Sequence, residues 1–135
     1  MLFQNPSLLC SQHAQRLFTS FILSRLRFRV ADKREKSYEE SGVGSCYMFR
    51  LDLERIVDAT MFGCMARFMN HSCQNNAYAK VITVNTEERQ EKKIVVFANR
   101  DIKKDEEITY DYKFPVEDGS LKCTCGAPNC IGRMN

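Results

Sequence analysis

Residues 67–73 read RFMNHSC, and this stretch decides how the rest of the chain is interpreted. Two further motifs lie towards the C-terminus: Tyr110-Asp111-Tyr112 and the spacing Cys123-x-Cys125-x4-Cys130. Together the three motifs combine an Asn-His pair, a pair of tyrosines and four thiols. This combination indicates a small enzyme whose reaction site is closed by a zinc-bound tail.

The length and the cysteine content limit the class of protein. A chain of 135 residues has room for one domain with a modest core, which a bound metal often helps to stabilise. Seven cysteines occur without a secretory signal pattern. This predicts a reducing compartment, where clustered thiols bind metal more often than they form disulfides. The odd number agrees, since seven thiols cannot all pair within one chain.

Charge is unevenly distributed along the chain. The formal net charge is +3, but four of the 20 basic residues and none of the 17 acidic residues lie in residues 1–31. The remainder is therefore nearly neutral. A nucleic-acid groove needs a concentrated positive field. We therefore expect no direct sequence-specific binding of nucleic acid, and a stand-alone zinc-binding nucleic-acid module is disfavoured.

Residues 1–29 differ in character from the rest of the chain. The apolar run at residues 17–23 is shorter than the roughly 20 residues that cross a bilayer, so we expect no membrane segment. An Arg-bearing, acid-free start is typical of a mitochondrial transit peptide. A partly helical appendage, or a sequence foreign to the domain, would share this composition. We assign residues 1–29 as a non-matching N-terminal segment, because they show neither a Gly turn nor strand alternation.

From residue 30 onwards the pattern becomes regular. The i,i+4 charge pairs Asp32/Lys36 and Lys36/Glu40 predict an exposed helix over residues 30–41 that ends at Gly42. Runs of β-branched and alternating residues predict strands, and the charged residues 87–91 predict a hairpin loop between two of them. Strands are expected at residues 46–51, 56–60, 77–84, 93–99 and 107–112, and a single helical turn at residues 64–69.

The terminal cysteines are candidate metal ligands. Cys123, Cys125 and Cys130 place three thiols within eight residues, with Gly and Pro between them to let the backbone fold around an ion. Tetrahedral zinc needs four nitrogen or sulfur ligands, so one must come from elsewhere. Cys73 is the leading candidate. The alternative is that these are ordinary reduced cysteines in a mobile tail.

The remaining polar and aromatic residues gain meaning only in combination. A histidine beside apolar residues is more often a hydrogen-bonded core residue than a functional one, and the same holds for core aromatics. In this chain, however, residues 30–135 resemble the C-terminal three-quarters of a SET domain followed by its post-SET zinc segment, as found in protein-lysine methyltransferases. The motifs that carry the resemblance are residues 31–36 (ADKREK), 44–52 (GSCYMFRLD), 56–60 (IVDAT), 67–73 (RFMNHSC), 106–114 (EEITYDYKF) and the final cysteine cluster.

The resemblance implies a fold and a function. It implies an α+β, mainly β fold of the SET type, β-clip-like and pseudoknotted, with a partial SET domain at residues 30–117 and a zinc-binding post-SET tail at residues 118–135. Residues 78–84 and 108–118 are most similar to the Set1/trithorax branch, whose COMPASS-type enzymes methylate lysine 4 of histone H3. The expected partners are the histone H3 tail and COMPASS-type activating subunits. The expected location is chromatin in the nucleus, although no compact Lys/Arg tract supports import.

The resemblance also assigns roles to residues. The cofactors it implies are S-adenosylmethionine, which donates the methyl group, and a structural Zn²⁺. The implied catalytic residue is Tyr112, with Tyr110 and Tyr47 beside it in an aromatic channel that lowers the pKa of the substrate amine, and Tyr110 limits how many methyl groups are added. The residues implied to bind the cofactor are Asn70, His71, Arg67 and Phe68. The implied zinc ligands are Cys73, Cys123, Cys125 and Cys130.

The chain departs from the family in two places. The Gly-containing strand pair that binds the methionine end of the cofactor has no counterpart in residues 1–29, and no glycine precedes Gly42. Residues 74–77 replace a stretch that usually contains a proline and a further cysteine, which we expect to alter only a turn. The first departure predicts that the isolated chain binds the cofactor poorly. The alternative function is therefore a catalytically silent SET remnant that binds histone or protein partners.

Overall fold

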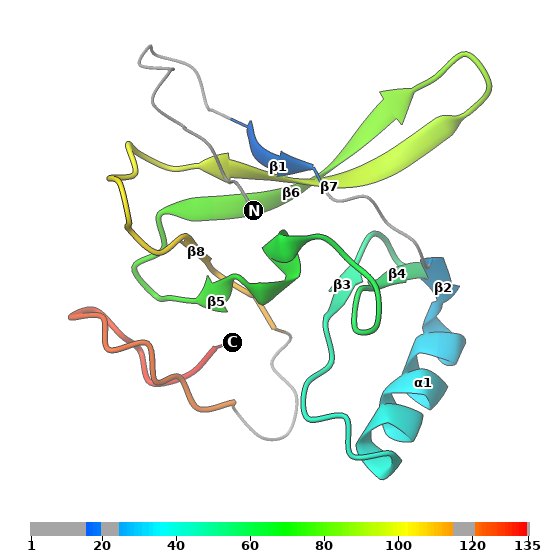
Figure 1. Cartoon of the computed structure of the whole chain (residues 1–135), viewed down its shortest axis with the longest axis horizontal. Coiled ribbons are helices and arrows are strands. Elements are labelled where there is room, and N and C mark those ends of the chain that lie inside the picture. Colours follow the sequence, from blue (N-terminus) through cyan, green and yellow to red (C-terminus); the bar gives the residue numbers. More distant parts are fainter. Residues whose placement is uncertain (1–15, 20–24, 115–120, 135) are drawn as a thin grey trace.

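The computed structural model describes residues 16–19, 25–114 and 121–134, and it is mostly β with one α-helix (Figure 1). This agrees with the predicted α+β, mainly β class. In chain order the elements are β1 Arg16–Thr19, β2 Arg25–Arg27, α1 Phe28–Glu40, β3 Met48–Arg50, β4 Arg55–Asp58, the 3-10 turn η1 Met65–Phe68, β5 Asn70–His71, β6 Ala77–Asn85, β7 Gln90–Ala98 and β8 Thr109–Tyr110.

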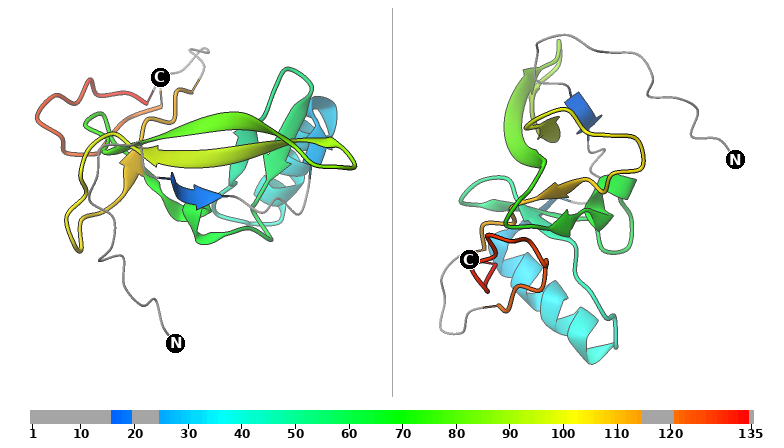
Figure 2. Two further views of the ribbon diagram at one scale, coloured as in Figure 1. Left: turned by 90° about the horizontal axis from the view of Figure 1, so that it is seen from above. Right: turned by 90° about the vertical axis from the view of Figure 1, so that its left-hand side faces the viewer.

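Two sheets contain all the described strands. The larger has the order β1-β7-β6-β8-β5, and the smaller has the order β2-β4-β3. The β6–β7 hairpin is antiparallel throughout, from Ala77 opposite Ala98 to Asn85 opposite Gln90. In Figure 2 it is a long twisted ribbon, with α1 towards one end of the molecule and the C-terminal tail towards the other.

The hydrophobic core lies between the hairpin and the smaller sheet. Leu51, Val57 and Ile94 form its buried cluster, against which the half-buried Phe49 and Val81 pack. Alternation explains this arrangement, because every second residue of a strand faces the same side. The core is small for a domain of this length. Other interactions must therefore fix the C-terminal tail at residues 121–134, where Cys123 is the one buried residue.

Helix α1 is tied to the smaller sheet by the buried carboxylate of Asp58 on β4. Asp58 Oδ2 accepts hydrogen bonds from Arg34 Nη1 at 3.0 Å and from the Tyr38 hydroxyl at 2.9 Å. Burial favours the neutral acid, but the hydrogen bonds from Thr60, Arg34 and Tyr38 outweigh burial and lower the pKa of Asp58. The helix ends as predicted at Gly42, whose φ of 72° suits glycine.

Strands β5 and β8 are short, parallel and far apart in sequence. Asn70 lies opposite Thr109 and His71 opposite Tyr110, and β8 also pairs with the start of β6 through Ala77 and Tyr110. The segment after η1 and the segment after residue 106 therefore lie side by side. This pairing places the two central sequence motifs next to each other, as the resemblance implied.

Most elements lie where the sequence predicted them, with ends displaced by at most three residues. No strand alternation is recognisable in residues 1–29, but two of the described strands lie there. Backbone pairing joins β1 to β7 and β2 to β4, so this part of the chain adds a strand to each sheet. Such three- and four-residue strands depend on distant partners, and a local pattern cannot reveal them. Within the described part of the chain, no helix is long and apolar enough to cross a membrane.

Candidate functional site

The site is built where β5 and β8 run side by side. Tyr112 lies two residues beyond the end of β8, and two bonds from the neighbouring segment hold it. Its hydroxyl donates to the Met69 carbonyl at 2.8 Å, and its backbone N–H donates to His71 Nδ1 at 3.2 Å. Both partners flank Asn70 in the RFMNHSC motif. This segment therefore fixes the Tyr112 side chain at its tip and at its backbone.

Aromatic rings surround Tyr112. Its ring centroid lies 4.9 Å from that of Tyr110, 5.2 Å from that of Phe114 and 5.3 Å from that of His71. On the other side, the Tyr47 ring meets Phe68 edge to face at 5.2 Å. The three tyrosines expected to form a channel thus belong to one aromatic region, since Tyr47 is also near enough to raise the pKa of Tyr112.

Both tyrosines of the Tyr-Asp-Tyr motif resist ionisation. Burial, helped by the nearby Tyr112, raises the pKa of Tyr110 to about 12. Burial is also the largest cause of the raised pKa of Tyr112, although a backbone hydrogen bond involving His71 opposes it. Both hydroxyls are therefore neutral at physiological pH. They can donate and accept hydrogen bonds but carry no charge.

The residues expected to bind a cofactor lie along η1 and β5. Asn70 Nδ2 donates to Glu107 Oε1 at 2.6 Å. Arg67 Nη1 donates to the Ala59 carbonyl at 2.8 Å, and its guanidinium lies over the Phe68 ring at 4.5 Å. Arg67 Nε is buried without a partner among the described residues. An unpaired buried donor is costly, and the other contacts of Arg67 hold it beside Phe68.

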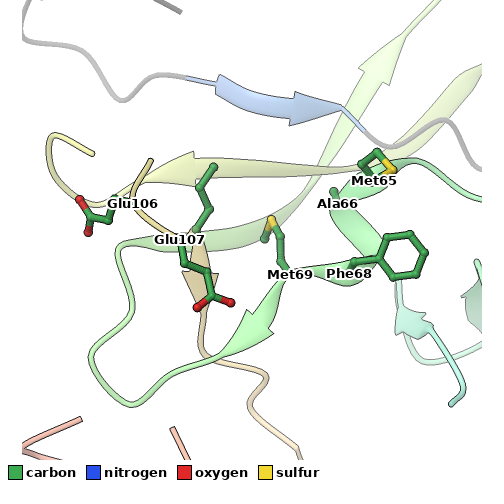
Figure 3. A pocket seen from close by; sticks show the side chains of 7 residues that line it. Met65, Ala66, Phe68, Met69, Glu106 and Glu107 are labelled. Carbon is green, nitrogen blue, oxygen red and sulfur yellow. The ribbon is translucent and has the colours of Figure 1, made fainter. Parts of the chain in front are cut away.

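A groove of about 310 Å³ adjoins these residues (Figure 3). Its walls are mostly apolar, and two carboxylates belong to its lining. The lining residues are Met65, Ala66, Phe68, Met69, Glu106, Glu107 and Ile108. Phe68 belongs to the groove, and Glu107 connects the groove to Asn70. A concave apolar surface with a few polar groups is the usual form of a small-molecule site.

Four thiols meet just beyond the end of β5, where Cys73 lies. The Sγ atoms of Cys73, Cys123, Cys125 and Cys130 all lie within 4.8 Å of one another, so the cluster could hold a metal ion. Cys73 Sγ lies 3.8 Å from Cys123 Sγ and 3.8 Å from Cys130 Sγ. These distances exclude disulfides, whose S–S length is about 2.0 Å. They match a tetrahedral Zn²⁺ with sulfur ligands at about 2.3 Å, which separates its ligands by about 3.8 Å.

The backbone of the tail supports the cluster. Residues 121–134 fold back on themselves through the bridge between Lys122 and Arg133 and the bond from Cys123 N–H to the Gly132 carbonyl at 3.0 Å. Gly126 has a φ of 69°, which lets the chain turn between two of the thiols. Backbone hydrogen bonds involving Cys73 and Ala127 lower the pKa of the Cys125 thiol to about 6. Such a thiol is ready to bind a cation as the thiolate.

The two remaining described cysteines lie outside the cluster. Cys46 and Cys64 are free and partly buried, and burial raises the pKa of Cys46. The structure therefore brings together the four cysteines that were expected to bind metal and leaves these two apart. It also brings Tyr47, Tyr110 and Tyr112 into one region, with Asn70 and Phe68 beside the groove.

Sequence reasoning missed Asn76. This residue is 2% exposed. Its Nδ2 donates to the Glu107 carbonyl at 2.8 Å and to Glu106 Oε1 at 3.0 Å, and its Oδ1 accepts from Thr109 N–H at 3.0 Å. Residues 74–77 therefore do more than alter a turn, because Asn76 anchors β8 beside the start of β6. An Asn-Asn pair directly before an apolar strand was the available signal.

The chain is similar to known proteins over most of its length. A sequence profile described as the SET domain matches residues 10–113, which begins before the expected start at residue 30. Histone-lysine N-methyltransferase set-2 of Caenorhabditis elegans is 51% identical over 119 residues, or 88% of this chain and 8% of that protein. Histone-lysine N-methyltransferase SETD1B of Homo sapiens is 50% identical over 122 residues, or 90% of this chain and 6% of that protein.

Histone-lysine N-methyltransferase SETD1 of Drosophila melanogaster is 50% identical over 122 residues, or 90% of this chain and 7% of that protein. The chain therefore spans less than a tenth of the length of these curated relatives.

Proposed function

The chain belongs to the SET-domain family, and on that premise we propose that it transfers methyl groups from S-adenosylmethionine to lysine 4 of histone H3. The observation that supports this most strongly is the fixation of Tyr112 by Met69 and His71 inside a group of aromatic rings. The names of the SETD1 and set-2 relatives support a histone-lysine substrate. The choice of lysine 4 rests on the resemblance to the Set1 branch.

We assign the aromatic region to the substrate lysine. A methyl transfer needs a neutral amine aligned with the methyl donor. The rings of Tyr47, Tyr110 and Tyr112 remove water from the ammonium group and thereby lower its pKa. The neutral Tyr112 hydroxyl, held by the Met69 carbonyl, orients the amine. The Tyr110 hydroxyl occupies space beside it and disfavours the addition of further methyl groups.

We assign the groove and the edge of the sheet to the cofactor. S-adenosylmethionine, when bound, supplies the electrophilic methyl group. Phe68 offers an apolar wall for it, and the guanidinium of Arg67, which lies over the Phe68 ring, supports that wall. Asn70 and His71 form β5, which is an edge strand of the larger sheet among the described strands, so backbone groups on its outer side are available to a ligand.

We assign Zn²⁺ to the four clustered thiols. A zinc site with four thiolate ligands is closed, without an open coordination position, and such sites are structural rather than catalytic. The chemistry of methyl transfer needs no metal at the reacting centre. Cys73, Cys123, Cys125 and Cys130 hold the ion, and the ion holds the tail against β5 and β8, where it forms one wall of the substrate site.

The proposed partners and location follow from the same assignment. A histone substrate implies a nuclear, chromatin-associated protein. COMPASS-type subunits are the proposed activators. The near-neutral charge beyond residue 31 supports a role in which other subunits make the contacts to nucleic acid.

The proposal is tested by methyl transfer to a histone H3 peptide, measured by mass spectrometry with COMPASS-type subunits present. We expect methylation of lysine 4 and none of a peptide with arginine at that position. Tyr112→Phe should lower kcat by a factor of about 10²–10³, the usual cost of losing one transition-state hydrogen bond. Tyr110→Phe should shift the product towards higher methylation. Tyr78→Phe, which changes a ring stacked on Phe97 away from the site, is the matched control.

Two results would contradict the proposal. Full activity of Tyr112→Phe would remove this residue from the catalytic role. Absence of transfer together with absence of S-adenosylmethionine binding by calorimetry, while the H3 peptide still binds, would support the silent binding module instead.

A further inference from the structure

The imidazole of His71 lies between the cysteine cluster and the catalytic tyrosine. Its side chain is 5% exposed. On one side, Nδ1 lies 3.2 Å from the backbone nitrogen of Tyr112. On the other side, Nε2 lies 3.6 Å from Cys73 Sγ. One buried ring therefore contacts both a proposed zinc ligand and the proposed catalytic residue.

The contact with Tyr112 determines which ring nitrogen carries the proton. A backbone N–H can only donate a hydrogen bond, so Nδ1 must accept and cannot carry hydrogen. In a neutral imidazole the proton is then on Nε2. This N–H points at Cys73 Sγ, which accepts the hydrogen bond. Asp111, whose Oδ1 lies 3.7 Å from Nδ1, is 43% exposed and is too distant to replace the Tyr112 contact.

We propose that His71 is a positioning residue that couples the metal-binding cysteine cluster to Tyr112, through Nε2–H donated to Cys73 Sγ and Nδ1 accepting from Tyr112 N–H. The inference rests on the proposed function for the identity of the metal and for the role of Tyr112. The two hydrogen bonds themselves do not depend on it.

The coupling has a physical basis at both ends. A hydrogen bond to a metal-bound sulfur stabilises the ligand and fixes its orientation. At the other end, Tyr112 lies outside β8, so His71 Nδ1 replaces the ladder partner that its N–H would otherwise lack. When the metal holds Cys73, the ring of His71 is held, and the backbone of Tyr112 is held with it. Loss of the metal therefore loosens the catalytic tyrosine without any direct contact between them.

The first test reads the tautomer of His71 directly. Nitrogen NMR of the zinc-loaded chain, labelled with ¹⁵N-histidine, distinguishes a protonated Nε2 from a protonated Nδ1. The one other histidine of the chain is His13, and the variant His13→Gln identifies its signal. From the two hydrogen bonds we expect the proton on Nε2. A proton on Nδ1, or on both nitrogens, would overturn the proposal, because neither form can accept from Tyr112.

The second test separates the two hydrogen bonds with two substitutions. In His71→Asn the amide lies near the position of Nδ1, so it keeps an acceptor for Tyr112 and loses the donor to Cys73. In His71→Gln the amide reaches the position of Nε2, so it keeps the donor and loses the acceptor. Loss of a hydrogen bond to a metal ligand weakens metal binding by about 10–100-fold.

We therefore expect opposite results from the two variants. His71→Asn should lose zinc to a chelator more readily, because its zinc affinity falls about 10–100-fold below that of the unmodified chain. Its Tyr112 amide should stay protected from hydrogen exchange while zinc is bound. His71→Gln should retain zinc but lose protection at the Tyr112 amide. Protection of the β6–β7 amides shows in each case that the domain is folded. Equal zinc release and equal Tyr112 exchange in both variants would overturn the proposal.

Neither test measures methyl transfer, so the two proposals fail separately. An inactive chain with the expected tautomer and the expected split between the variants would refute the methyltransferase and leave the coupling intact. An active chain with a proton on Nδ1 would refute the coupling and leave the proposed methyltransferase intact.

Discussion

The β6–β7 hairpin and the C-terminal tail are held in different ways. In the hairpin, residues 77–85 pair in register with residues 90–98, and Ile94, Val95 and Val96 are buried. In the tail, an isolated bridge joins Lys122 to Arg133, and Cys123 is the only buried residue among residues 121–134. Backbone pairing and apolar burial are sufficient for the hairpin. The tail has too little of either and depends on its thiols.

This difference bears on the site. The hairpin supplies the rigid frame to which β8 is joined through Ala77 and Tyr110. The tail supplies Cys123, Cys125 and Cys130, which reach Cys73 beside β5. The proposed channel therefore has one side fixed by packing and another side fixed by a metal. A perturbation of the metal should affect the second side far more than the first.

The largest expected effect comes from Cys125→Ser. Structural zinc contributes on the order of 10 kcal/mol to the folding of small metal-dependent units, and loss of one thiolate removes most of that. We expect loss of bound zinc by elemental analysis and rapid proteolysis within residues 121–134. Cys64→Ser is the matched control, since Cys64 is free and lies outside the cluster, and it should retain one zinc per chain. A folded wild-type sample without stoichiometric zinc would contradict the assignment.

A smaller effect is expected from Ile94→Ala in the hairpin. Ile94 is 8% exposed and belongs to the core cluster with Leu51 and Val57. Truncation of a buried isoleucine costs about 2–5 kcal/mol, measured as the change in free energy of unfolding in urea. Leu53→Ala, at a residue that is 89% exposed, should change it by less than about 0.5 kcal/mol. The folded Ile94 variant should still bind one zinc, and loss of zinc there would show that the two regions are not separable.

The smallest expected effect is the dependence of stability on pH that Glu106 contributes. Glu106 anchors the segment before β8. Arg100, followed by the Lys103 backbone N–H and Asn76, lowers the pKa of Glu106 from 4.5 to about 2. A carboxyl with a lowered pKa in the folded state stabilises the fold above its unfolded pKa, and the stabilisation is lost as the pH falls through the folded value. Glu106→Gln should therefore lower the melting temperature slightly at neutral pH. The difference should shrink between about pH 4.5 and pH 2 and vanish below. A constant difference across this range would contradict the role of the charge.

The sequence predicted those parts that depend on local pattern or on motif. The charge pairs from Asp32 to Glu40 predicted α1, and the charged loop at residues 87–91 predicted the hairpin, because both signals are contained in a few neighbouring residues. The spacing of the terminal cysteines predicted three of the clustered thiols. Cys73 lies 50 residues before Cys123, and it was the leading candidate for the fourth ligand because it follows the His71-Ser72 turn.

The parts that could not be predicted depend on partners distant in the chain. Strands β1 and β2 are recognisable only beside β7 and β4. The Asn-Asn pair before β6 draws attention to Asn76, but its partners Glu107 and Thr109 lie more than 30 residues away and cannot be read from that pair. The same holds for His71, whose two ring contacts depend on Cys73 and Tyr112 being brought to opposite sides of one ring. Tertiary contact, rather than local propensity, decides these cases.

Hydrogen exchange of the zinc-loaded chain, measured before and after removal of the metal with a chelator, tests most directly whether metal and packing order different parts of the site. We expect residues 121–134 and the Tyr112 amide to lose their protection when the metal is removed. We expect the amides of β6 and β7 to keep theirs. Unchanged protection of the tail without metal, or equal loss of protection in the hairpin and in the tail, would contradict the division between metal and packing.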